Sequence, residues 1–254
     1  QGNFSVRMDE TGTYELAVLN DSFNRMVQEL DKLVEDIRVE QLNLRAAELK
    51  LLQEQINPHF LYNTLDTIMW LAESKDTEQV VKMVSSLSDF FRTTLSKGKD
   101  FITVEEEKKH IKSYLEIQQF RYRDILEYEI CFSEEIYQYE MLKLTLQPLV
   151  ENALYHGIKN KRGLGHIKVT GEKEGENLIF KVRDNGIGMT EERSRQVQQL
   201  IRGEKLSDKE SSGFGLFNIN ERIRLHYGME YGLTLKSTYR EGTEFQVKIP
   251  CVKK

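Results

Sequence analysis

An acid at the end of a predicted strand, followed by two closely spaced glycines, constrains the fold of this chain more than any other feature. Residues 177–183 read NLIFKVR, and this alternation of apolar and polar side chains predicts a β-strand. Asp184, Gly186 and Gly188 follow at once in the run DNGIGM. A carboxylate at a strand end can accept a hydrogen bond from an exocyclic amino group, and glycine lets the backbone approach a flat ring. The run therefore suits the adenine of ATP, although Asp-Asn-Gly is also common in ordinary turns.

Two further motifs, one on each side of this strand in the sequence, provide what the phosphates of a nucleotide need. Gly213 and Gly215, in GFGLFNINERI, open a predicted helix at residues 215–227, where free N–H groups and the helix dipole favour phosphate. Asn152, in LQPLVENALYHGI, lies on a predicted helix at residues 144–157 and offers a neutral oxygen to Mg²⁺. Each motif alone is weak, but their order along the chain is specific. The sequence has no Walker-type G-x-x-x-x-G-K-[ST] motif and no complete G-x-G-x-x-G fingerprint.

A histidine in the N-terminal half offers an acceptor for a phosphoryl group. Residues 55–65 read QINPHFLYNTL, and Pro58, directly before His59, forces a helix to kink or restart there. At about 100° per residue, His59 faces away from the apolar stripe that this segment predicts. The stripe consists of Leu61, Leu65, Ile68 and Ala72. A histidine on a polar helix face is often simply solvated, but the nucleotide motifs further along the chain favour a reactive role.

These motifs resemble those of a known superfamily. Asn152, DNGIGM and GFGL are similar to the N, G1 and G2 boxes of the GHKL superfamily, which includes histidine kinases, Hsp90, gyrase and MutL. QINPHFLYNTL resembles the phosphoacceptor motif of bacterial sensor histidine kinases of the LytS/YesM type, and residues 101–124 resemble the segment that joins the two domains in that subgroup. The similarity runs from residue 48 to residue 250, where GTEFQVKIP resembles the family's closing strand.

The resemblance implies a function and a set of site residues. It implies that His59 is phosphorylated from ATP and that the phosphoryl group passes to an aspartate of a response regulator. Asn63 matches the position that helps hydrolyse the aspartyl-phosphate of that regulator. Glu151 and Asn152 match the acid–amide pair of the N box, with Asn152 as the expected Mg²⁺ ligand. The other expected nucleotide contacts are His156, Asp184, Gly186, Gly188, Gly213, Gly215 and Leu216.

Two positions depart from the more common kinase pattern. Phe60 stands where larger kinase groups place an acid directly after the histidine, as is usual for this subgroup. Another group must therefore orient the ring of His59, and the candidates are Gln55, Glu54, Asp66 and a residue of a second chain. Asp66 is the preferred anionic candidate because it shares the helix face of His59. Tyr155 stands where the N box more often has Lys or Arg, which leaves open which group binds the ATP phosphates.

The pattern of apolar residues predicts an α+β protein with three parts. Residues 1–26 contain MDETGTYELAVLNDSFNRM, which resembles the second half of a HAMP linker. Residues 27–100 are expected to form a parallel coiled coil and a helical hairpin, so that two chains make a dimeric four-helix bundle. Residues 101–254 are expected to form the GHKL α/β-sandwich domain that binds ATP. The heptad positions of the coil are Phe23, Met26, Leu30, Leu33, Ile37, Leu44, Ala47 and Leu51. A single amphipathic helix packed on its own domain is the alternative.

The expected secondary structure places helices on one face of a sheet. The expected helices after the phosphoacceptor segment are residues 77–96, 104–122, 144–157 and 215–227, with a break at 97–100. The expected strands are residues 126–132, 166–172, 177–183, 232–238 and 243–249. Residues 190–212 are polar and charged and are expected to be a mobile ATP lid, although a plain loop would have the same composition.

Composition narrows the range of partners. The chain has 254 residues and a net charge of −5, which argues against nucleic acid as its main partner. Cys131 and Cys251 are expected to be reduced cytosolic residues. His110, His166 and His226 are expected to have surface or structural roles. The sequence has no run of about 18 apolar residues, so no segment in it is expected to span a membrane. The HAMP-like segment implies the cytoplasmic portion of a bacterial cell-membrane protein, attached only through N-terminal segments outside this sequence.

Two other functions fit part of the sequence. A GHKL ATPase that uses ATP as a conformational clamp would explain the nucleotide motifs but would give no purpose to QINPHFLYNTL or to the coil. A catalytically inactive signal relay would explain the helices, but the intact Asn152, Asp184 and glycines speak against it. The expected function is therefore a protein-histidine kinase, a homodimer that uses ATP and Mg²⁺.

Overall fold

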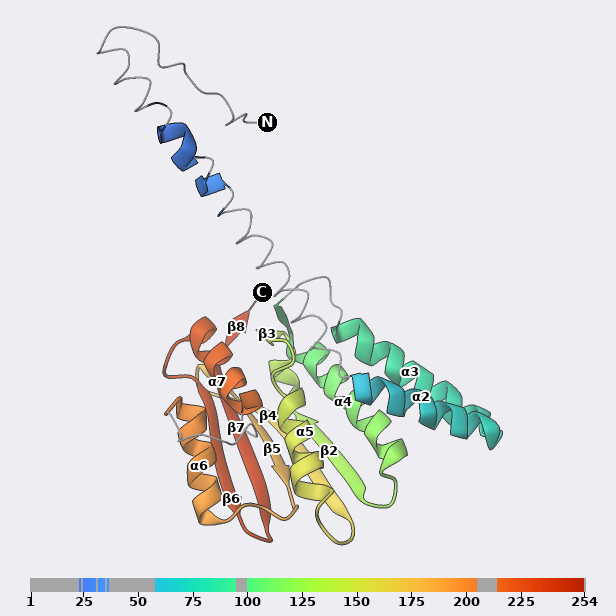
Figure 1. Cartoon of the computed structure of the whole chain (residues 1–254). Helices are drawn as coiled ribbons and strands as arrows, with labels where there is room; N and C mark the ends of the chain where they lie inside the picture. Colours follow the sequence, from blue (N-terminus) through green and yellow to red (C-terminus); the bar gives the residue numbers. More distant parts are fainter. Residues whose placement is uncertain are drawn as a thin grey trace, which may run out of the picture. The chain divides into compact units, whose positions relative to one another are not determined.

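The structure, a computed structural model, describes residues 23, 25–30, 32–34, 36, 58–94, 100–204 and 214–253 (Figure 1). The chain divides into two compact units, residues 1–61 and residues 62–254. In the first unit, the described residues up to 36 are helical. Most of the HAMP-like segment and of the expected coiled coil lies outside the described residues.

Two helices follow where the hairpin was predicted, α2 (Pro58–Glu73) and α3 (Thr77–Thr94). The buried residues of α3 are three or four positions apart, on one face of the helix; they are Met83, Ser86, Phe90 and Thr94. This face packs on helix α4 (Val104–Arg121). There the ring of Phe90 stacks on that of His110 with 4.6 Å between centroids, and Ser86 Oγ donates a hydrogen bond to Glu116 at 2.7 Å. The second helix of the hairpin is therefore fixed to the first helix of the C-terminal half.

The apolar stripe predicted on α2 is only partly covered in the described chain, where Leu61 and Ile68 are half-buried. Leu65 is 44% exposed and Ala72 is also exposed, whereas Thr64 and Leu71 are buried. Three more large apolar side chains of this helix are exposed, those of Tyr62, Met69 and Trp70. Because α2 carries apolar residues around much of its circumference, the spacing of its leucines could not identify the buried face.

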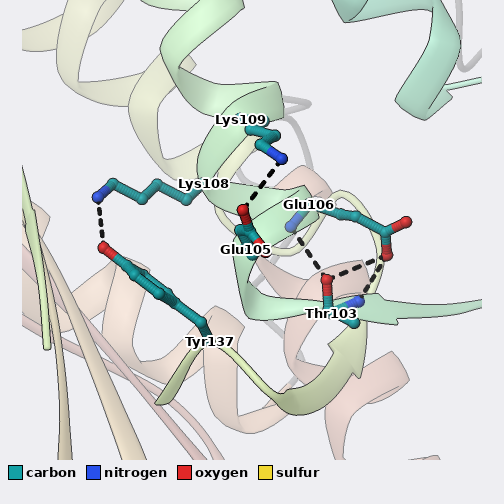
Figure 2. Close-up of polar contacts among 6 residues, drawn as sticks. All are labelled: Thr103, Glu105, Glu106, Lys108, Lys109 and Tyr137. Carbon is teal, nitrogen blue, oxygen red and sulfur yellow. Dashed lines mark hydrogen bonds and ion pairs between the residues drawn. The ribbon is translucent and has the colours of Figure 1, made fainter. Parts of the chain in front are cut away.

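Helix α4 begins at a capping box (Figure 2). Thr103 Oγ1 accepts a hydrogen bond from the backbone N–H of Glu106 at 3.2 Å, and the Glu106 carboxylate accepts one from the backbone N–H of Thr103 at 2.8 Å. One turn further on, Lys108 Nζ donates to Tyr137 Oη at 2.6 Å. This bond connects the helix to the segment directly before strand β3 (Tyr139–Leu142). The cap fixes where α4 starts, and so it fixes which of its later side chains are buried.

The helix predicted from residue 144 begins three residues later, as α5 (Gln147–Asn152), and continues as the π-helical turn η2 (Ala153–Ile158). Leu144 has a φ of 57°, a left-handed conformation that is incompatible with the helix. The buried carboxylate of Glu107 on α4 accepts hydrogen bonds from the N–H groups of Leu144, at 3.0 Å, and Leu146, at 2.8 Å. These two bonds fix the turn immediately before α5.

The mobile lid expected at residues 190–212 is wrong over much of its length, because helix α6 (Glu191–Arg202) occupies it. Thr190 Oγ1 accepts a hydrogen bond from the backbone N–H of Arg193 at the first turn, and Gly203, with a φ of 81°, ends the helix. Only three residues of α6 are buried, Ser194, Val197 and Ile201, so the helical period was hidden among charged side chains. Residues 205–213 lie outside the described residues. Helix α7 (Phe214–Tyr227) lies where it was predicted.

The main sheet has five strands in the order β2–β4–β5–β7–β6. They are β2 (Leu126–Phe132), β4 (Gly165–Glu174), β5 (Asn177–Asp184), β6 (Gly232–Thr238) and β7 (Gly242–Pro250). Strands β2 and β4 pair in parallel, and the other neighbours are antiparallel. Alternate side chains of β7 are buried, and helices α5, α6 and α7 cover that face of the sheet (Figure 1). The predicted α/β layers and strands are confirmed, each strand end lying within two residues of its prediction.

A second sheet of three short strands was not predicted. It contains β1 (Phe101–Thr103), β3 (Tyr139–Leu142) and β8 (Val252–Lys253), in the antiparallel order β1–β3–β8. A short 3₁₀ turn, η1 (Glu134–Ile136), precedes β3. Strands of two to four residues are too short to display a period, so they could not be predicted from the sequence.

Candidate functional site

A cavity of about 280 Å³ lies within the second unit, over the ends of the central strands. Five of the residues that were predicted to contact a nucleotide line it, Asn152, His156, Asp184, Gly188 and Leu216. They come from α5, η2, β5, the loop after β5 and α7. Folding therefore brings three separate sequence motifs to one cavity.

Asp184 is the buried acid of this cavity, only 2% exposed. Its Oδ1 accepts a hydrogen bond from the backbone N–H of Gly186 at 2.7 Å, which holds the carboxyl group in place. Burial raises the pKa of Asp184 from 3.8 to about 6, and the hydrogen bond from Gly186 and the charge of Lys161 offset only part of this effect. The side chain is thus a fixed acceptor in a site of low polarity.

Gly157, on η2, is a residue of this site that the sequence reasoning missed. A β-carbon at Gly157 would lie 2.6 Å from Asp184 Oδ1, so any larger residue would displace the acid. Gly186 does not line the cavity, but a β-carbon there would collide with the backbone of Gly157. Gly188 has a φ of 60°, which favours glycine. Contact with the Asp184 carboxylate therefore explains Gly157, contact with the Gly157 backbone explains Gly186, and a left-handed turn explains Gly188.

The acid–amide pair lies where α5 passes into the π-helical turn. The side-chain amide of Asn152 donates from Nδ2 to the carbonyl of Pro148 at 2.7 Å, which turns its oxygen away from that carbonyl. Glu151 is half-buried, and burial raises its pKa above the ordinary value, partly offset by a hydrogen bond from Gln147. Asn152 lines the cavity, whereas Glu151 does not. π-Helical turns are often found at functional sites, because they change which side chains face one direction.

Arg193 is a second residue that the sequence reasoning missed. It lies in the first turn of α6 and lines the cavity, as do Thr243 and Phe245 of β7. Among the lining residues that the structure describes, Arg193 is the only arginine or lysine. Tyr155, which stands at the usual N-box position of a cation, does not line the cavity, and its hydroxyl accepts a hydrogen bond from Gln118 at 3.3 Å. The assignment of residues 190–212 to a loop concealed the position of Arg193.

The two remaining glycines of the predicted site are not among the described residues that line this cavity. Gly215 is exposed at the start of α7 and does not line it. Gly213 lies outside the described residues.

The predicted phosphoacceptor His59 belongs to the first unit and is exposed near the start of α2. Asn63 is half-buried and, together with Asp66, lines a groove of about 770 Å³ between α2, α3 and the end of α4. Of the groups considered for orienting the ring of His59, Glu54 and Gln55 lie outside the described residues.

Two negative findings apply to the described part of the chain. None of its helices has both the length and the apolar character that crossing a bilayer requires. It also contains no group of three or more His, Cys, Asp or Glu residues that could hold a metal ion.

Two family models match this chain. The histidine kinase model matches residues 47–126, and the model of histidine kinase-, DNA gyrase B- and HSP90-like ATPases matches residues 139–253. The sensor histidine kinase YesM of Bacillus subtilis is 36% identical over 251 residues, which cover 99% of this chain and 41% of YesM. The sensor protein LytS of Bacillus cereus is 37% identical over 209 residues, 82% of this chain and 34% of LytS. The sensor histidine kinase BtsS of Escherichia coli is 31% identical over 207 residues, with the same coverage. The chain therefore spans between a third and two fifths of the length of these relatives.

Proposed function

Because this chain belongs to the bacterial sensor histidine kinases of the LytS and YesM type, we propose that it phosphorylates His59 from ATP and passes the phosphoryl group to an aspartate of a response regulator. The observation that carries this proposal is the cavity, where residues of three separate motifs converge beside a buried acid. A kinase of this kind needs a nucleotide site and an accessible histidine, and His59 is exposed.

In this proposal, different residues of the cavity bind different parts of ATP. The fixed carboxylate of Asp184 accepts a hydrogen bond from the exocyclic amino group of adenine. Arg193, at the edge of the cavity, faces the negative charge of the phosphates and takes the place of the missing N-box cation. Asn152 supplies a neutral oxygen to Mg²⁺, an ion that usually has few protein ligands and keeps phosphate oxygens and water as the others. Bound Mg²⁺ would neutralise charge on the phosphates during transfer.

Transfer to His59 depends chiefly on positioning. One imidazole nitrogen must carry a lone pair and lie in line with the γ-phosphate, while the other nitrogen is held by a hydrogen-bond partner. We propose Asp66 or a residue of a second chain as that partner; Asp66 is exposed and shares the helix face of His59 on α2. The phosphohistidine then serves as donor to the aspartate of the regulator, and Asn63 assists the later hydrolysis of the aspartyl-phosphate.

The exposed apolar side chains of α2 and α3 support a homodimer. Six of them are more than 40% exposed in the described chain, Tyr62, Leu65, Met69, Trp70, Val81 and Val84. Apolar residues in such number on neighbouring helices favour a second copy that covers them, as in a four-helix bundle. We propose the same division of the sequence as before, with residues 1–26 as a partial HAMP-like linker, 27–100 as coil and dimeric phosphotransfer hairpin, and 101–254 as the catalytic domain. The chain is then the cytoplasmic portion of a membrane receptor.

One experiment separates the kinase from its alternatives. The purified chain and its His59→Gln variant are incubated with γ-labelled ATP, and the retained label is tested for stability in acid and in alkali. The proposal requires label that is stable in alkali and lost in acid, in the wild type only. A clamp ATPase would release phosphate and retain no label, and an inactive relay would do neither. Either of these two results would contradict the proposal.

A further inference from the structure

His110 is a buried histidine with only one of its two ring nitrogens hydrogen-bonded in the described chain. It lies on α4 with no exposed surface. Its Nε2 lies 2.6 Å from Gln147 Oε1, and one face of its ring stacks on Phe90 at an angle of 20° between ring planes. Its Nδ1 is buried and has no hydrogen-bond partner among the residues that the structure describes. A buried polar atom without a partner is unfavourable, and a phenylalanine would fill this space without that cost. The position therefore has a reason other than packing to be histidine.

The hydrogen bonds around Gln147 indicate why this position is a histidine. The amide of Gln147 donates from Nε2 to Glu151 Oε1 at 2.9 Å, one turn further along α5. Its Oε1 then faces His110, so the imidazole must donate from Nε2. The opposite orientation of the amide would place its oxygen against the Glu151 carboxylate. The donor of His110 and the acceptor of Glu151 thus select one orientation of the amide between them.

We propose that His110 and Gln147 are positioning residues for Glu151, with the N–H of His110 fixing the Gln147 amide so that it holds the Glu151 carboxylate beside Asn152. This inference rests on the proposed function and on the resemblance that matches Glu151 and Asn152 to the acid–amide pair of the N box. The stack with Phe90 fixes the plane of the imidazole, because α3 packs against α4 at this point. The chain His110–Gln147–Glu151 links the helical hairpin, by two hydrogen bonds and one ring contact, to the residue that directly precedes the cavity residue Asn152.

Two substitutions of His110 separate positioning from packing. His110→Phe keeps an aromatic ring against Phe90 and removes the N–H donor. His110→Gln keeps a donor close to the position of Nε2, because a glutamine amide nitrogen can reach the same place. Single-turnover labelling at varied ATP gives a maximal rate constant and the ATP concentration at half-maximal rate. His110→Phe should lower the rate constant about tenfold and leave that ATP concentration within about twofold. The rate constant of His110→Gln should stay within about threefold of the wild-type value. Equal rates for His110→Phe and the wild type, or the same loss in both variants, would overturn the proposal.

A double-substitution cycle tests whether the effect passes through Glu151. If it does, His110→Phe should cause no further loss of rate in a Glu151→Gln background, whereas two independent effects would multiply. Gln147→Leu removes the half-buried residue that joins His110 to Glu151. It should cause the same loss of rate, and it replaces His110→Phe as the test if that variant folds poorly. Multiplicative effects in the cycle, or a normal rate for Gln147→Leu, would contradict the proposal.

A measurement without nucleotide keeps this inference distinct from the proposed function. The side-chain amide protons of Gln147, seen by ¹⁵N-labelled NMR, should be protected from exchange with water in the wild type and in His110→Gln, and should exchange at least about tenfold faster in His110→Phe. Equal protection in all three proteins would refute the positioning role even if the chain is an active kinase. Loss of protection in a chain that takes up no label would uphold the positioning role and count against the proposed function alone.

Discussion

Replacing Asp184 by asparagine should stabilise the free protein while it weakens the binding of ATP. The carboxyl group is buried, and its pKa is raised from 3.8 to about 6. A shift of this size corresponds to roughly 3 kcal/mol by which the folded state disfavours the ionised acid. Asparagine has almost the same shape, and its oxygen can still accept the hydrogen bond from Gly186. At neutral pH, Asp184→Asn should therefore raise the free energy of unfolding by up to about 3 kcal/mol.

The pH dependence of this gain has a definite sign. Because the pKa of Asp184 is higher in the folded state than in the unfolded state, the native protein binds the proton more tightly. Ionisation of Asp184 lowers the free energy of unfolding of the wild type. This loss is absent below the unfolded pKa, grows between the two pKa values and is complete above about pH 7. The stability difference between Asp184→Asn and the wild type should thus be largest near pH 7 and should almost vanish near pH 4.

Urea unfolding followed by circular dichroism at several pH values measures this difference. Asp89→Asn is a matched control, because Asp89 is exposed and makes only a long ion pair with Arg92. The variant should also lose about 10- to 100-fold in affinity for a fluorescent ATP analogue, since its amide N–H₂ would face the amino group of adenine and leave a donor unpaired. A stability difference that does not change with pH, or a less stable Asp184→Asn at neutral pH, would refute the reasoning.

Three further predictions follow from the structure. Arg193→Gln should raise KM for ATP about tenfold with little change in thermal stability, measured by labelling at varied ATP, and an unchanged KM would contradict its contact with the phosphates. Thr103→Ala should lower the free energy of unfolding by about 1 kcal/mol through loss of the capping box, and no change in urea unfolding would contradict that role. Glu107→Ala should lower it by about 2–5 kcal/mol, because the buried N–H groups of Leu144 and Leu146 lose their acceptor. A loss below about 1 kcal/mol would mean that water replaces the carboxylate.

The sequence predicted the central strands well, and it identified motifs that the fold brings to one cavity, because both have short-range causes. Alternation along residues 177–183 defines β5, and the glycines after Asp184 are needed for local backbone geometry and close contact. Gly157 could not be recognised in the same way, since its reason is a carboxylate from a distant strand. His110 was assigned a surface or structural role because its partners Phe90 and Gln147 are brought to it only by tertiary packing.

The failures concern helices whose period was ambiguous. Helix α6 buries only three residues, so its charged majority looked like a loop, and Arg193 was missed with it. Helix α2 has the opposite composition, with apolar residues such as Leu65 and Trp70 exposed as well as Leu71 buried. In both helices the neighbours, and not the local pattern, decide which face is covered.

We propose above that ATP bound in the C-terminal cavity phosphorylates His59. The most direct measurement is to incubate the chain with ATP and Mg²⁺, digest it in alkali to preserve phosphohistidine, and locate the phosphoryl group by mass spectrometry with electron-transfer fragmentation. We expect one modified histidine, His59, and no modification in an Asp184→Asn chain at ATP concentrations well below the raised Kd of this variant. A phosphoryl group on another residue, or none on a wild-type chain that binds ATP, would contradict it.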